Sequence, residues 1–289
     1  MMIRLYRTLA VLIVALLALG IASAEGDEES VPYVQASGFN APVLEGWADL
    51  STDEIAQFHL AEAEATIRTA LAAGADPPAA ARSHLADWLG SEIGEPAYSD
   101  KVNLADGTWH SLVFDIDAAT TASVMARQDD ANVVLISFVE TSPDARTIML
   151  TLAQADDALD NATPEIGLAL DRMAGLELDQ LDEAGIVDLP SGEWQVYERD
   201  GLSAMGMVFG NDSYVALQDG APADLARLAD AWNRTLLGFF ITPDNSLYLA
   251  LGLIATFGIL GLLILSYFWR SRSIQRDLAM LNALAAEED

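Results

Sequence analysis

An apolar run of 22 residues, from Leu247 to Phe268, contains no charged side chain. A helix rises about 1.5 Å per residue, so this run spans roughly 33 Å, enough for a bilayer core of about 30 Å. Arginines follow it at positions 270, 272 and 276. The pattern predicts a transmembrane helix over 246–269 with a short cytoplasmic tail over 270–289. A buried helix of a globular domain is the alternative.

A shorter apolar run, from Leu9 to Ile21, follows two arginines and precedes Ala22-Ser23-Ala24. This order is typical of a signal peptide over 1–24, so the mature chain is expected to begin at Glu25. An uncleaved signal anchor is the alternative. Because the positive charges follow the long apolar run and none closely precedes it, we expect the region before it to lie outside the cytoplasm.

Between the two apolar runs, the spacing of apolar residues changes repeatedly between the periods of strands and helices. Residues 25–50 are expected to form an acidic leader and the first strands. Capping residues predict helices at 51–58, 77–89, 143–159, 163–176 and from Pro222 to Leu237. Strand-forming runs lie at 65–71, where a helix is the alternative, and at 98–104, 108–116, 122–128 and 133–139. The Asp106-Gly107 pair predicts a hairpin turn.

Two segments of this region are similar. NLADGTW at 103–109 corresponds to DLPSGEW at 188–194, and runs of comparable length follow each. Pro78 stands 31 residues before Trp109, and Pro164 stands 30 before Trp194. We therefore expect an α+β exported domain of two tandem α-β-β-β-β-α units with antiparallel sheet, over 51–160 and 161–243, besides the transmembrane helix. A chance alignment of two meanders is the alternative.

The net charge of the chain limits its possible partners. The chain has a formal net charge of −30, and its segment from Glu25 to Pro243 holds 9 basic and 39 acidic residues. Such a surface repels phosphate backbones, which excludes DNA and RNA as partners. The chain has no cysteine, so the domain must be stable through its core and without disulfides.

The segment GFNAPVLEGW, from Gly38 to Trp47, resembles the opening of PsbP-like domains, where an apolar strand ends in a Pro-x-Gly-Trp turn. Pro42 stands four residues before Gly46 instead of two. The resemblance covers about residues 39–90. It implies a sandwich of sheet and helices, and a non-enzymatic accessory module.

Few residues suit catalysis. His59, His84 and His110 are far apart in the sequence, Lys101 is the single lysine, and HExxH, GxSxG and Ser-x-x-Lys motifs are absent. Most nucleophilic and zinc mechanisms therefore lose their usual residues. A serine, a histidine and an aspartate brought together only by the fold would be the exception. We expect no catalytic, cofactor or metal residues.

Acidic and aromatic residues offer two further candidates. Calcium ligands are conceivable in three clusters, although solvated turns are the better explanation because no EF-hand spacing occurs. Trp109 and Trp194 are expected to pack in the core of each unit, and an exposed ligand platform is the alternative. The three acidic clusters are Asp129, Asp130 and Asn132; Asp156, Asp157 and Asp160; and Asp179, Asp182 and Glu183.

Together these patterns predict a single-pass, membrane-anchored, extracytoplasmic binding or accessory module. It would be embedded through Leu247 to Phe268 and would act with a protein partner in the same membrane or envelope. An envelope hydrolase with a site assembled only by the fold is the alternative.

Overall fold

A computed structural model describes residues 32–104, 106–152, 162–209, 212–220, 224–241, 256–257, 259–261 and 263–276. Contacts divide the chain into one unit from Met1 to Phe240 and another from Ile241 to Asp289. The α+β class and the predominantly antiparallel sheets are confirmed. The predicted signal peptide, and the tail beyond Arg276, lie outside the described residues.

In the second unit, the described residues between Thr256 and Arg276 are helical. No helix within the described ranges is both long enough and apolar enough to cross a membrane. The predicted span from Leu247 to Phe268 also includes residues 247–255, 258 and 262, which are outside those ranges.

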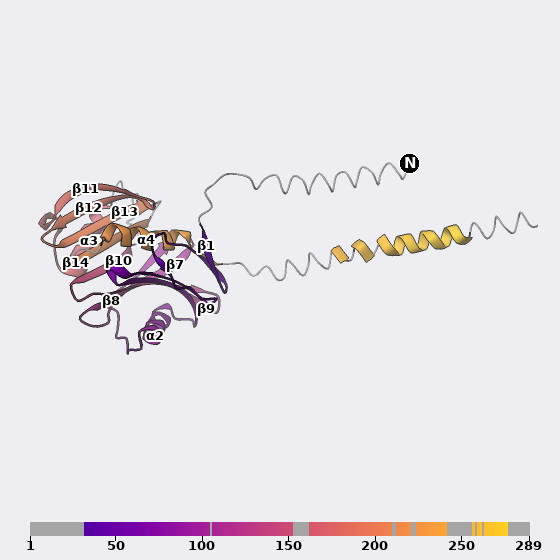
Figure 1. Cartoon of the computed structure of the whole chain (residues 1–289), viewed down its shortest axis with the longest axis horizontal. Coiled ribbons are helices and arrows are strands. Elements are labelled where there is room, and N and C mark those ends of the chain that lie inside the picture. The colour runs from indigo at the N-terminus through magenta and orange to yellow at the C-terminus, as the bar shows by residue number, and fades with distance from the viewer. Residues whose placement is uncertain are drawn as a thin grey trace, which may run out of the picture. The chain divides into compact units, whose positions relative to one another are not determined.

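The larger sheet of the first unit has seven antiparallel strands in the order β3-β4-β5-β9-β8-β7-β6. Helix α2 (Pro77–Leu89) covers one face of it (Figure 1), with Ala81 and Leu85 packed on apolar side chains of β7, β8 and β9. The strands are β3 (Ala48–Asp49), β4 (Ile55–Leu60), β5 (Ala65–Ala73), β6 (Tyr98–Leu104), β7 (Gly107–Asp115), β8 (Thr120–Asp129) and β9 (Asn132–Thr141).

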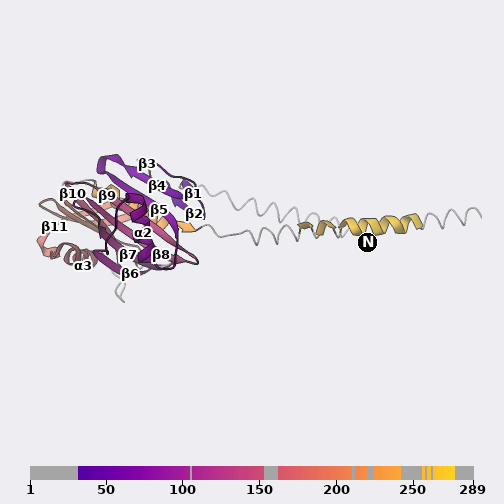
Figure 2. The same cartoon turned by 90° about the horizontal axis from the view of Figure 1, so that it is seen from below.

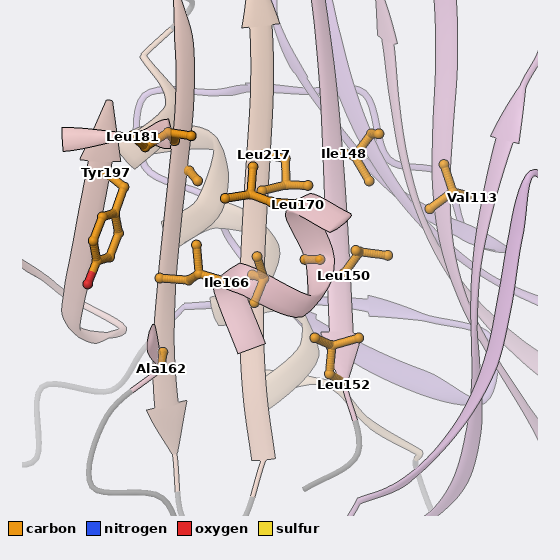
Figure 3. Packing of buried hydrophobic residues seen from close by; sticks show 13 residues of the cluster. Val113, Ile148, Leu150, Leu152, Ala162, Ile166, Leu170, Leu181, Tyr197 and Leu217 are labelled. Atoms are coloured by element: carbon orange, nitrogen blue, oxygen red, sulfur yellow. The ribbon is translucent and has the colours of Figure 1, made fainter. Parts of the chain in front are cut away.

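The smaller sheet has five antiparallel strands in the order β10-β14-β13-β12-β11. Helix α3 (Thr163–Ala174) crosses one face, and Figure 3 shows Ile166 and Leu170 of this helix over the strands. The strands are β10 (Ala145–Leu152), β11 (Asp182–Leu189), β12 (Gly192–Arg199), β13 (Leu202–Phe209) and β14 (Asp212–Gly220).

Helix α4 (Leu225–Gly238) packs between elements of both sheets. Its Trp232 meets Phe138 of β9 edge to face, with ring centres 6.5 Å apart, and Asn233 donates to Met207 Sδ of β13 at 3.0 Å. The remaining elements are short: β1 (Tyr33–Ala36), β2 (Phe39–Pro42), β15 (Phe240–Ile241) and the 3₁₀ turns η1 (Ala61–Ala63) and η2 (Leu178–Gln180).

Strand β10 joins the two sheets through its outer edge. Its backbone N–H groups at Thr147, Met149 and Thr151 have no strand partner on that side. They donate instead to side-chain oxygens of the larger sheet: Glu140 Oε2 at 2.7 Å, Ser123 Oγ at 2.9 Å and Ser111 Oγ at 3.4 Å. Buried backbone donors need such partners, so these contacts allow an edge strand to be buried.

Two predicted helices are strands. The second half of the expected helix at 51–58 belongs to β4, in which Ala56, Phe58 and Leu60 are buried alternately with less buried residues. The Thr52 hydroxyl does accept a backbone N–H, from Glu54 at 3.3 Å, but it closes a turn and caps no helix. The alternation of period two fits a sheet with one face on the core, so the prediction was wrong.

The expected helix at 143–159 begins as strand β10, and residues 153–159 lie outside the described part of the chain. Ser142 Oγ accepts from the backbone of Asp144 and Ala145, which forms a turn. The Ser142 oxygen accepts backbone N–H groups, as that of a helix cap does, but a strand follows it, so the predicted helix was wrong over 145–152. The first meander is followed by β10 and not by a helix.

Candidate functional site

An open cavity of about 520 Å³ lies beside the C-terminal end of α3, over the face of the smaller sheet that this helix covers. Pockets of this size commonly hold small molecules. Its apolar wall consists of side chains from β10, β13 and β14, from the end of α3 and from the segment that follows. These are Ile148, Leu202, Leu217, Met173, Leu176 and Leu181.

The local sequence explains why the cavity is there. Gly175 follows α3 with a φ of 64°, and its N–H bonds to Asp171 O, which ends the helix. The N–H of Leu176 then reaches back to Leu170 O at 3.4 Å, a pattern in which the chain turns away after a left-handed glycine. Leu217, which lies beside Leu170 of α3 in Figure 3, and Ile148 line the cavity next to the point where the helix stops.

Two arginines and two aspartates line the cavity, and each arginine pairs with a further aspartate outside the lining. Arg146 forms an ion pair with Asp115 at 2.7 Å, and Arg199 forms one with Asp182 at 3.0 Å. The hydrogen bond from Arg199 lowers the pKa of Asp182 below its usual value. Both guanidinium groups therefore already have carboxylate partners, and Asp200 and Asp219 add two further carboxylates to the rim. Such a rim disfavours a strongly anionic ligand.

The histidines lie on three different elements and none lines this cavity. His59 Nδ1 of β4 is 3.1 Å from Thr66 Oγ1. Burial, and secondarily the charge of Arg68, lowers the pKa of His84 to about 4, and burial chiefly lowers the pKa of His110 on β7. In the part of the chain that the structure describes, no hydrogen bond or ion pair joins a histidine to a carboxylate.

One of the three acidic clusters forms a turn. Asp129, Asp130 and Asn132 form the turn between β8 and β9, where Asp130 has a left-handed φ of 48°. Asp182, from the second described cluster, pairs with Arg199, whereas the cluster at 156–160 lies outside the described residues. Within the described ranges, no three His, Cys, Asp or Glu side chains are placed to hold a metal ion.

Trp109 and Trp194 are each the third residue of a strand, β7 and β12, and each is only 1% exposed. Their indole N–H groups donate to a residue three positions earlier: Trp109 to Asp106 Oδ1 at 2.8 Å, and Trp194 to Ser191 Oγ at 3.1 Å. The core interpretation is confirmed, and the exposed aromatic platform is wrong.

Sequence reasoning did not find the cavity, because no motif marks it. Its residues come from positions 146–148, 173–181, 199–202 and 217–219, and only the sheet order brings these together. The available signal was the end of a predicted helix close to a glycine, followed by Leu176, Leu178 and Leu181, which keep an apolar face after the helix has ended.

The chain was compared with family models, curated proteins and solved structures, and none of them matches it.

Proposed function

We propose that the protein is a membrane-anchored extracytoplasmic binding module, exported by a signal peptide over 1–24 and embedded through Leu247 to Phe268. It acts with a protein partner in the same membrane or envelope, while its acidic domain faces away from the cytoplasm. The apolar runs and the arginines after Phe268 support this orientation. The excess of 39 acidic over 9 basic residues from Glu25 to Pro243 disfavours nucleic acid as a partner.

The cavity beside α3 is the observation that carries the binding function. Its wall is apolar, its rim is polar, and its two arginines are already paired with carboxylates. The chemistry that suits it is a small, mainly apolar molecule with an uncharged polar end. A hydrolase is less well supported, because the cavity is not lined by histidine, serine or lysine.

We also propose that the first unit arose from two copies of one β-α-β-β-β-β arrangement, beginning at Ala65 and at Ala145. In each sheet a strand is followed by a helix and a four-stranded meander, and the last meander strand pairs with the first strand: β9 with β5, and β14 with β10. Gly107 and Gly192 share a φ of 137°, each two residues before its tryptophan. In this arrangement the first copy begins at Ala65 and not at residue 51, and the second begins with β10, one strand before residue 161.

Blocking the cavity tests the binding function. Ala174 is exposed at its edge, so Ala174→Trp places a large ring at the mouth without disturbing the core. The full chain would be purified in detergent from its own membranes and weighed by native mass spectrometry. We expect a bound organic molecule on the wild-type protein and its loss from Ala174→Trp.

Leu168→Trp is the matched control, because Leu168 lies on the same helix, is 40% exposed and does not line the cavity. This variant should keep the bound molecule. If no organic molecule accompanies the wild-type protein, or if both variants carry the same amount of it, the cavity is not the binding site.

A further inference from the structure

Arg68 of β5 differs from the other arginines that the structure describes between Pro32 and Phe240. Seven arginines form ion pairs with carboxylates, whereas Arg68 forms none with any residue that the structure describes. In a chain with a net charge of −30, an arginine without a carboxylate partner is available to an anion from outside the chain. The paired arginines are Arg82, Arg127, Arg146, Arg172, Arg199, Arg227 and Arg234.

The surroundings of Arg68 hold its guanidinium group in place. Its Cζ lies 4.9 Å from the ring centre of Trp88 on α2, a cation–π distance. Strand pairing puts Gln57 of β4 opposite it on one side and Ser137 of β9 on the other, so all three share a face of the sheet. This is the face that α2 covers, as Figure 2 shows from below.

Three buried polar atoms on these elements have no partner among the described residues: Arg68 Nε, Ser137 Oγ and His84 Nε2. Buried polar atoms without a partner are rare in native structures, and each needs an explanation. Arg68 Nε donates only, the serine hydroxyl is able to donate, and His84 Nε2 donates when it carries the proton. Donors of this kind bind the oxygens of anions strongly.

We propose that the layer between α2 and strands β4, β5 and β9 is an oxyanion site, where Arg68 binds a carboxylate or phosphate group with Ser137 and His84 as further donors. Trp88 orients the guanidinium plane, and Gln57 adds an amide beside it. The site is separate from the cavity beside α3, which lies on the smaller sheet and suits an uncharged ligand.

His84 provides a direct readout. The positive charge of Arg68 contributes to the low pKa of His84, which is about 4, and the negative charge of Asp87 on the same helix opposes it. A bound anion next to Arg68 offsets the positive charge and stabilises the imidazolium. Anion binding must therefore raise the pKa of His84.

The test follows the His84 imidazole by NMR in the full chain in detergent, with the resonance identified by its loss in His84→Gln. Inorganic phosphate and acetate are titrated separately against sodium chloride at equal ionic strength. We expect a saturable shift and a raised His84 pKa with at least one oxyanion but not with chloride. Phosphate alone would indicate a phosphoryl ligand, and acetate alone a carboxylate.

Arg68→Met keeps the apolar stem and removes the charge, so it should weaken oxyanion binding by about tenfold or more. Its His84 pKa should start higher and no longer respond to the anion. Arg82→Met, which removes an exposed arginine on α2 paired with Glu95, should bind like the wild type. The proposal fails if chloride matches both oxyanions in the wild-type protein, a comparison that requires no variant to fold, or if Arg68→Met responds unchanged.

Discussion

At the scale of single residues, Glu140 is an acidic side chain that is buried away from water. It is 1% exposed, at the end of β9, and accepts from Thr147 N at 2.7 Å and from Thr147 Oγ1 at 3.0 Å. Gln218 Nε2 donates to the same hydroxyl at 2.9 Å. No cation pairs with it within the described ranges. Burial therefore raises the pKa of Glu140, although the hydrogen bonds from Thr147 oppose this.

This placement predicts a dependence of stability on pH. Because the folded-state pKa of Glu140 is above its ordinary value of 4.5, the folded protein holds this proton more tightly than the unfolded chain. The stability that the folded protein gains from this bound proton is present at low pH and is lost as pH rises through the folded-state pKa of Glu140. Glu140→Gln has no proton to lose, so its free energy of unfolding should increase relative to that of the wild type as pH rises above about 4.5.

Urea unfolding of both proteins at several pH values measures the difference. Glu45→Gln, at an exposed carboxylate, is the control and should follow the wild type at every pH. A constant difference between Glu140→Gln and the wild type would show that the carboxyl group does not titrate differently in the folded state.

At the scale of elements, the sequence predicted those whose signals are local. The four strands of the first meander, the strand at 65–71 and helices α2, α3 and α4 were all found, because alternation, a proline in the first turn or an Asp-Gly turn marks each of them. Strands β4 and β10 were missed. Each follows a serine or threonine that caps a helix in many proteins but closes a turn here.

The pairing partners that determine these two strands are distant from them in the sequence. Strand β10 pairs along its length with β14, so that Leu150 faces Val215, and its free edge is buried on Ser111 and Ser123. The oxygens that satisfy this edge belong to another sheet. A local pattern carries no information about such partners, and the same holds for the cavity and for the setting of Arg68.

The close packing of α3 on the smaller sheet depends on Gly206 of β13. A Cβ at this position would lie 2.8 Å from Ile166 Cγ1 and 3.1 Å from Ala162 Cβ, closer than ordinary contact. Gly206→Ala should therefore push α3 away and lower the free energy of unfolding by about 1–3 kcal/mol. Gly94→Ala, where a Cβ meets nothing within 4 Å, should change it by less than about 0.5 kcal/mol.

Chemical unfolding of the two glycine variants beside the wild type compares these sites. Equal stability of Gly206→Ala and Gly94→Ala would mean that α3 does not rest on β13 as closely as described.

At the scale of the whole molecule, the proposed orientation rests on the distribution of charge and on the two apolar runs. The acidic residues before Pro243 contrast with the arginines that follow Phe268, and this asymmetry sets the proposed orientation. A domain so acidic is repelled by anionic headgroups, so in the proposed arrangement only the anchor would hold it at the membrane. Ligand binding beside α3 and at Arg68 would then occur on the outer side.

The most direct test of this account is protease accessibility in intact cells or spheroplasts that carry the full chain with a tag after Asp289. Protease added outside should digest the region from Glu25 to Pro243 and leave a small, tagged fragment that contains the apolar run and the tail. The tail should be digested only after the membrane is permeabilised. Protection of Glu25 to Pro243 in intact cells, with or without loss of the tag, would contradict the proposed export and orientation.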